Sequence, residues 1–153
     1  MISENCILIF DFFTLIIENC KLIIEHFQKD FFMERKYDLE DRLVLFAANV
    51  IKFCNTVPND FAGTHLKGQL IRSSCSPALN YGEAQSAESK KDFIHKMSIS
   101  LKELKESRTS IKILDKIQYG DSEKRILIFK ECEELTAIFA SIINNTKRNM
   151  QKP

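Results

Sequence analysis

The sequence has no tryptophan, only four glycines and three prolines, and no Cys-x-x-Cys pair among its five cysteines. So few turn-forming residues argue against a fold of many short strands and favour a few long helices. The cysteines, at positions 6, 20, 54, 75 and 132, lack the spacing of a zinc site. We therefore expect free and mostly buried thiols in a reducing cytoplasm.

An excess of one charge is also missing, since 22 basic and 21 acidic residues leave a net charge of +1. This balance predicts no strong attraction to nucleic acid or to an anionic membrane. No phosphate-binding glycine loop occurs. A di-iron bundle needs Glu-x-x-His on two helices, and the nearest match, Asp92-x-x-His95, occurs once. We predict no metal site and no cofactor.

The first 33 residues differ from the rest of the chain. Acidic residues at positions 4, 11, 18 and 25 follow a period of seven among many Ile, Leu and Phe residues. The charges interrupt the run of about 20 apolar residues that a membrane span needs, and no basic region precedes a signal-like stretch. The segment is either an amphipathic or coiled-coil helix or translated upstream DNA, and we favour the second, with Met33 as the natural start. We expect a bundle domain over residues 34–148 and a tail over 149–153.

From Asp38 onward, apolar residues recur at spacings of three and four, which predicts helices. Asp38, Ser89 and either Asp121 or Ser122 are candidate N-caps, and Gly120 is the expected C′ residue that ends the third helix. The fourth helix is expected to fray over residues 144–148. Four amphipathic helices with short connections predict an all-α, antiparallel, up-down-up-down four-helix bundle. The stripe of the first helix is Leu43, Phe46, Ala47, Val50, Ile51 and Cys54.

The second helix, within residues 66–87, carries an unusual stripe of uncharged polar and charged residues. The stripe is either a structural network that joins helices or subunits, or the wall of a ligand cleft, and we favour the network. Arg72 and Glu83 lie three helical turns apart and cannot touch each other, so each needs a partner on another helix or another subunit; Glu103 is one candidate for Arg72. Arg108, the one charge on the stripe of the third helix, is expected either to extend its charged end to solvent or to pair with a carboxylate such as Glu83 or Glu103. The candidate residues on the second helix are Gln69, Arg72, Ser73, Ser76, Asn80 and Glu83.

The order Gln69-x-x-Arg72-Ser73, Ser76, Asn80-x-x-Glu83, Asp92-Phe93 and Leu101-x-Glu103-Leu104 resembles a bacterial family. Its members are small four-helix-bundle proteins first noticed in intervening sequences of 23S ribosomal RNA genes. The resemblance covers about residues 37–145, with departures at Pro77 and Gly82. It implies a homopentamer without catalytic residues. A related branch comprises accessory proteins of diversity-generating retroelements, which are basic pentameric barrels that bind nucleic acid and a reverse transcriptase.

Two functions therefore remain open for the chain. The first is a non-enzymatic, cytoplasmic scaffold that assembles with itself and binds no membrane and no metal. The second is a nucleic-acid-binding accessory protein, which would bind through lysines of the third helix. Acidic residues are interleaved with those lysines in the sequence, so we favour a solvated face over a binding face. The lysines of this candidate nucleic-acid face are Lys90, Lys91, Lys102, Lys105, Lys112 and Lys116.

Overall fold

The computed structural model describes residues 39–151, and this part of the chain forms four α-helices without a strand. The helices are α2 (Leu39–Cys54), α3 (Phe61–Gln85), α4 (Lys90–Lys116) and α5 (Ser122–Met150). The N-terminal segment of residues 1–33, the proposed start at Met33 and the expected N-cap Asp38 lie outside the described residues.

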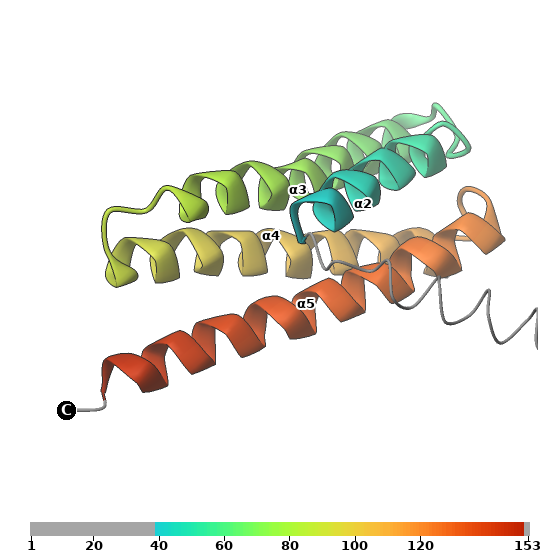
Figure 1. The fold of residues 1–153 in the computed structure, drawn as a ribbon. Coiled ribbons are helices and arrows are strands. Elements are labelled where there is room, and N and C mark those ends of the chain that lie inside the picture. Colours follow the sequence, from blue (N-terminus) through green and yellow to red (C-terminus); the bar gives the residue numbers. More distant parts are fainter. Residues whose placement is uncertain (1–38, 152–153) are drawn as a thin grey trace, which may run out of the picture. The chain divides into compact units, whose positions relative to one another are not determined.

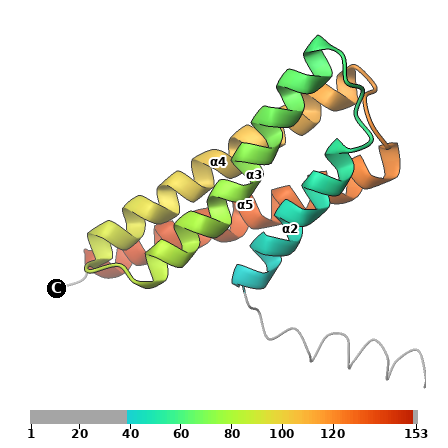
Figure 2. The same cartoon turned by 90° about the horizontal axis from the view of Figure 1, so that it is seen from above.

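Each helix packs on two neighbours, and this arrangement confirms the antiparallel four-helix bundle. Helix α2 contacts α3 and α5, and α4 also contacts α3 and α5, so that α2 and α4 lie diagonally across the bundle (Figure 1). Helix α2 has 16 residues, whereas the other three have 25 to 29. It therefore runs along only the half of the bundle next to the α2–α3 and α4–α5 loops (Figure 2).

Side chains that cap free backbone groups set the starts of three helices. The Asp60 carboxylate accepts from the Gly63 N–H at 2.7 Å, the Ser89 hydroxyl from Asp92 at 3.1 Å, and the Asp121 carboxylate from Lys124 at 2.9 Å. Each oxygen satisfies one of the four N–H groups that a helix leaves without an internal acceptor. Ser89 and Asp121 are confirmed as N-caps.

Helix α4 ends at Lys116, four residues before the expected glycine. Its C-cap is Ile117, and Gln118 adopts the left-handed conformation with φ of 55°. The Tyr119 N–H donates to the Leu114 carbonyl at 2.9 Å, and the Gln118 N–H donates to the Asp115 carbonyl at 3.1 Å. This is the Schellman pattern with Gln118 at C′, so the assignment of C′ to Gly120 was wrong.

Gly120 instead serves the loop that follows, because a side chain there would be excluded. Its φ is +77°, and a Cβ would lie 2.7 Å from the Phe53 ring. The loop thus comes close to the end of α2. Helix α5 corrects a second expectation, because it stays helical through residues 144–148 to Met150.

The core is a single cluster that all four helices supply. Ile51 was wrongly assigned to it, since that side chain is 42% exposed whereas Phe53 is fully buried. Apolar side chains buried in this way are the main source of stability in a bundle. The largest buried side chains are Phe46, Phe53, Phe139, Leu43, Leu70, Met97, Leu104, Ile111, Leu114 and Leu135.

Candidate functional site

The polar stripe of α3 joins α3 to α4 by ion pairs, but not through the predicted partner. Arg72 contacts Glu106 at 3.0 Å, and the Gln69 amide donates to the same carboxylate at 3.4 Å. Glu103, the candidate partner, makes no ion pair with Arg72. The Arg72 side chain is 71% exposed, so this pair contributes about 1 kcal/mol or less.

The remaining residues of the stripe do not converge on one site. Glu83 pairs with Lys96 across the α3–α4 interface, near the far end of α3. The Asn80 amide donates to the Ser76 carbonyl at 2.9 Å, within its own helix. The stripe therefore consists of separate contacts spaced along α3.

Arg108 lies on the side of α4 away from Glu106 and Arg72, and it connects α4 to α5. It contacts Glu133 at 3.0 Å, so neither Glu83 nor Glu103 is its partner. Its Nε is buried without a hydrogen bond in the described part of the chain. The predicted cluster is thus divided between two helix interfaces, one with Arg72 and one with Arg108.

Five serines of α3 and α4 are buried, which sequence reasoning did not single out as a set, and three of them form hydrogen bonds between the two helices. The hydroxyls of Ser73 and Ser107 are 2.8 Å apart, and that of Ser100 donates to the Pro77 carbonyl at 3.4 Å. Small side chains let two helices approach closely, and these hydrogen bonds satisfy hydroxyl groups that burial would otherwise leave unbonded. Ser73, counted in the polar stripe, is fully buried while its neighbour Arg72 is exposed. The five are Ser73, Ser74, Ser100, Ser107 and Ser110.

A set of polar contacts ties the two loops at the short-helix end of the bundle. The Tyr119 hydroxyl donates to Asp60, and the Asp121 N–H donates to the Thr56 hydroxyl at 2.9 Å. The hydrogen bond from Tyr119, more than that from Gly63, lowers the pKa of Asp60, and the same bond raises the pKa of Tyr119. The two loops are therefore coupled through an ionised carboxylate.

Arg125 completes this end of the bundle and is 5% exposed. It donates to the Tyr119 carbonyl at 2.9 Å, to the Gly120 carbonyl at 3.2 Å and to Asp115 at 3.1 Å. A cation near the C-terminus of α4 also compensates the negative end of the helix dipole. In the sequence Arg125 directly follows Lys124, and nothing in the sequence indicates that it is buried.

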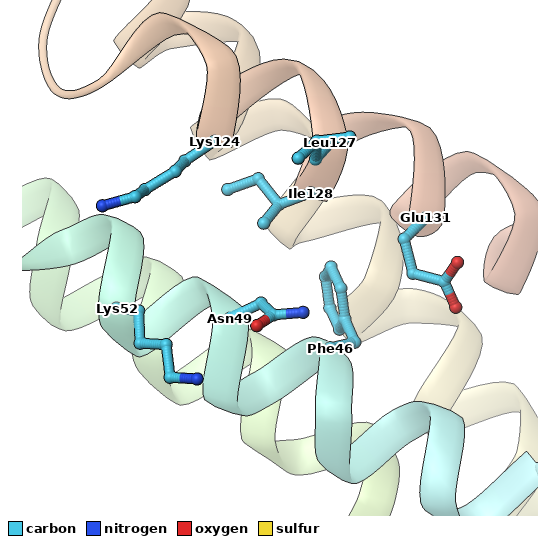
Figure 3. Close-up of a pocket in the computed structure, with 7 residues that line it drawn as sticks. All are labelled: Phe46, Asn49, Lys52, Lys124, Leu127, Ile128 and Glu131. Atoms are coloured by element: carbon cyan, nitrogen blue, oxygen red, sulfur yellow. The ribbon is translucent and has the colours of Figure 1, made fainter.

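The groove between α2 and α5 has a volume of about 190 Å³. Figure 3 shows Lys52 and Lys124 towards one end, Glu131 at the other, and the Phe46 ring and the Asn49 amide between them. Arg42 contacts Glu131 at 2.8 Å, and neither lysine forms an ion pair within the described part of the chain. The groove can therefore accept an apolar group beside an anion. Its lining is Phe46, Asn49, Lys52, Lys124, Leu127, Ile128 and Glu131.

A second groove, of about 520 Å³, lies between the C-terminal part of α4 and the start of α5. We call it the α4–α5 groove. The Lys112 ammonium lies 5.7 Å from the centre of the Phe129 ring, where the face of the ring attracts a cation. The groove is lined by Ile111, Lys112, Asp115, Lys116, Arg125, Ile126 and Phe129.

The lysines of α4 share a face that the linear sequence conceals. At about 100° per residue, Lys91, Lys102, Lys105, Lys112 and Lys116 fall within about 80° of one another, whereas Lys90 and Lys96 lie outside this arc. The acidic residues of α4 lie outside this arc, and two of them, Glu106 and Asp115, are paired with arginines. All six predicted lysines are exposed. The lysines and the acidic residues of α4 alternate along the sequence, but on the helix surface most of the lysines lie on a face without acidic residues.

The thiols of Cys54 and Cys132 are poor nucleophiles. Burial raises the pKa of Cys54 to about 11 and that of Cys132 to about 12, so both remain protonated at neutral pH. Within residues 39–151 no cluster of three or more His, Cys, Asp or Glu side chains could hold a metal ion. In the same residues no helix is long and apolar enough to cross a membrane.

Comparison with known proteins bears on the same bundle. A crystal structure of a protein of unknown function from Bacteroides thetaiotaomicron, assigned to the S23 ribosomal protein family, is similar to this chain with a TM-score of 0.63 and 29% identity. The match covers 68% of this chain and 96% of the other. A search of curated proteins found no match.

The family comparison covers most of the bundle. The model of the 23S rRNA-intervening sequence proteins matches residues 35–141, from just before α2 to within α5. This range includes the polar residues of α3 and the lysines of α4. The chain therefore belongs to the family of 23S rRNA-intervening sequence proteins.

Proposed function

We propose that this protein is a non-enzymatic scaffold of the cytoplasm that assembles with copies of itself. The observation that carries the proposal is the apolar surface on two neighbouring helices. Val44 and Leu45 of α2 are 54% and 59% exposed, and Ile126 and Leu127 of α5 are 66% and 67% exposed. Large apolar patches on a protein surface mark contacts with other molecules.

The polar residues support a structural role. Arg72, Glu83 and Arg108 each form an ion pair that joins two helices. The three cysteines of the described residues, Cys54, Cys75 and Cys132, are free thiols, which suits a reducing compartment. The resemblance to the family implies a pentamer, and we adopt five subunits as the expected number.

The mass of the full chain in solution tests this proposal. Light scattering coupled to size exclusion should give a multiple of 17.8 kDa, with five chains as the expected assembly. Because association follows mass action, dilution should shift the population towards smaller species. A mass of one chain at every concentration would refute self-assembly.

The lysine face of α4 favours a second candidate, a nucleic-acid-binding accessory protein. An acid-free row of exposed lysines can neutralise phosphates without reading the sequence, and several copies in one assembly would add avidity. Binding should therefore weaken steeply with salt and be indifferent to base sequence. A reverse transcriptase is the partner that kinship with the retroelement accessory proteins suggests.

Paired substitutions separate this candidate from nonspecific attraction. Replacing Lys105 and Lys112 by Gln should weaken RNA binding and reduce its salt dependence, because two phosphate contacts are lost. The matched control replaces Lys130 and Lys147 of α5, which leaves the α4 face intact at the same net charge. Equal losses in both variants, or tight binding that salt does not change, would contradict a lysine-face interaction.

A further inference from the structure

The α4–α5 groove combines an apolar lining with an excess of positive charge. Ile111 lies at its base and is 1% exposed, whereas Ile126 at its edge is 66% exposed. Its volume of about 520 Å³ falls within the range of about 300–1,000 Å³ that is usual for small-molecule sites. The groove is therefore large enough for a small organic ligand with an apolar body.

Three cations and one carboxylate line this groove. Asp115 contacts Arg125 at 3.1 Å, so these two charges offset one another. Lys112 and Lys116 form no ion pair within the described part of the chain. The Phe129 ring holds the Lys112 ammonium 5.7 Å from its centre. The uncompensated charge of the groove is thus positive, and an aromatic ring positions part of it.

Arg125 adds a hydrogen-bond donor that the fold holds in place. Its Nε and Nη1 groups donate to Asp115 and to the carbonyls of Tyr119 and Gly120. Its Nη2 group forms no hydrogen bond among the described residues, and this atom is not sealed from solvent. Because the side chain is only 6% exposed, it is already ordered. An anion in the groove can therefore accept a charge-assisted hydrogen bond from Nη2 at little cost in side-chain entropy.

From these features we propose that the α4–α5 groove binds a small amphipathic anion. The apolar body of the ligand packs on Ile126 and Phe129, and its carboxylate or phosphate head lies beside Lys112, Lys116 and Arg125. The lining includes no uncharged polar side chain, so a hydrocarbon body suits the groove better than a nucleobase, whose polar edges would lose their hydrogen bonds to water. The ligand binds within one bundle, so this site depends neither on self-assembly nor on nucleic-acid binding.

Methyl NMR of the full chain with labelled isoleucines tests the proposal, because Ile111 and Ile126 report directly from the groove. The probe is octanoate, and octanamide is its neutral counterpart of nearly the same shape. Octanoate should shift the Ile126 signal with a Kd on the order of 1 mM, as expected for a ligand of this size. Octanamide should bind about tenfold more weakly, because it lacks the charge. Octyl phosphate compares the two head groups, and the tighter of the two anions identifies the preferred head.

Two matched double variants locate the head group. Lys112→Gln with Lys116→Gln removes the unpaired charges of the groove, and it should weaken octanoate binding about tenfold while hardly changing octanamide binding. Lys102→Gln with Lys105→Gln removes two charges from the same face of α4 outside the groove, and it should change neither affinity. All four lysines are exposed, so neither double variant should disturb folding.

A second control uses the groove between α2 and α5, which also joins apolar surface to unpaired lysines but has a volume of about 190 Å³. Lys52→Gln with Lys124→Gln should leave octanoate binding intact. Loss of binding in this control, or equal losses in the two α4 double variants, would overturn the proposal. Equal affinities for octanoate and octanamide, or an Ile126 signal that octanoate does not shift, would also overturn it.

Discussion

Arg125 offers the sharpest test of how the loop end of the bundle is held. In Arg125→Met the aliphatic stem is preserved, but the donors to two carbonyls and to Asp115 are lost. A hydrogen bond from a charged donor contributes roughly 1.5–3 kcal/mol. The Asp115 side chain is 53% exposed, so its ion pair adds about 1 kcal/mol or less.

The expected cost is smaller than the sum of these contributions. The loop lies at the end of the bundle, so water can reach the two released carbonyls, and the methionine adds apolar contact. We therefore expect Arg125→Met to lower the free energy of unfolding by about 2–4 kcal/mol. For a domain of this size that corresponds to a melting temperature lower by roughly 6–16 °C.

Chemical and thermal unfolding at one fixed protein concentration measure the effect. Arg72→Met is the matched control, because this arginine is 71% exposed and contacts one carboxylate, and its loss should cost about 1 kcal/mol or less. Arg125→Lys keeps the charge but cannot reach all three acceptors, so it should fall between wild type and Arg125→Met. Equal stability of the Arg125→Met and Arg72→Met proteins would refute the reasoning.

Three further predictions concern glycine, acid and thiol chemistry. Gly68→Ala should stabilise the protein by about 0.5–1 kcal/mol, because the new Cβ lies in mid-helix and meets open space. Gly120→Ala should destabilise it by at least about 1 kcal/mol, because an L side chain is strained at φ +77°. Chemical unfolding should therefore give changes of opposite sign in the free energy of unfolding for the two variants. Because the folded-state pKa of Asp60 is lowered, its stabilisation is present above the ordinary pKa of 3.8 and is lost as the pH falls through the lowered value. Tyr119→Phe should move that pKa upward in a carboxyl NMR titration, and an unchanged pKa would contradict the assigned cause. In the folded protein a thiol reagent should modify Cys75 well before Cys54 or Cys132, as peptide mass spectrometry can show, and equal rates would mean that the buried thiols are open to solvent.

The four-helix architecture could be predicted because its signals come from residues that are close together in the sequence. Ser89 and Asp121 were identifiable as N-caps because the capping hydrogen bond spans only three residues. The apolar stripes were readable because a helix returns to the same face every three or four residues. Together they predicted the bundle and most of its core. The exception was Ile51, which the stripe included and the structure exposes.

The helix ends were less predictable from sequence. Gly120 is the residue best suited to a left-handed C′ position, yet Gln118 occupies it. The glycine was needed two residues later, where the Phe53 ring leaves no space for a side chain. That requirement comes from another helix and leaves no trace in the local sequence.

Partners and burial were decided by the tertiary structure alone. Ser73 and Arg72 are adjacent in the polar stripe, but one is fully buried and the other is exposed, because the packing of α4 selects which part of the arc is covered. Arg125 reads as one more surface cation until the turn after α4 brings two carbonyls to it. The sequence thus determined which residues share a helix face, through the fixed helical period. Only the packing of one helix against another determined what each face meets.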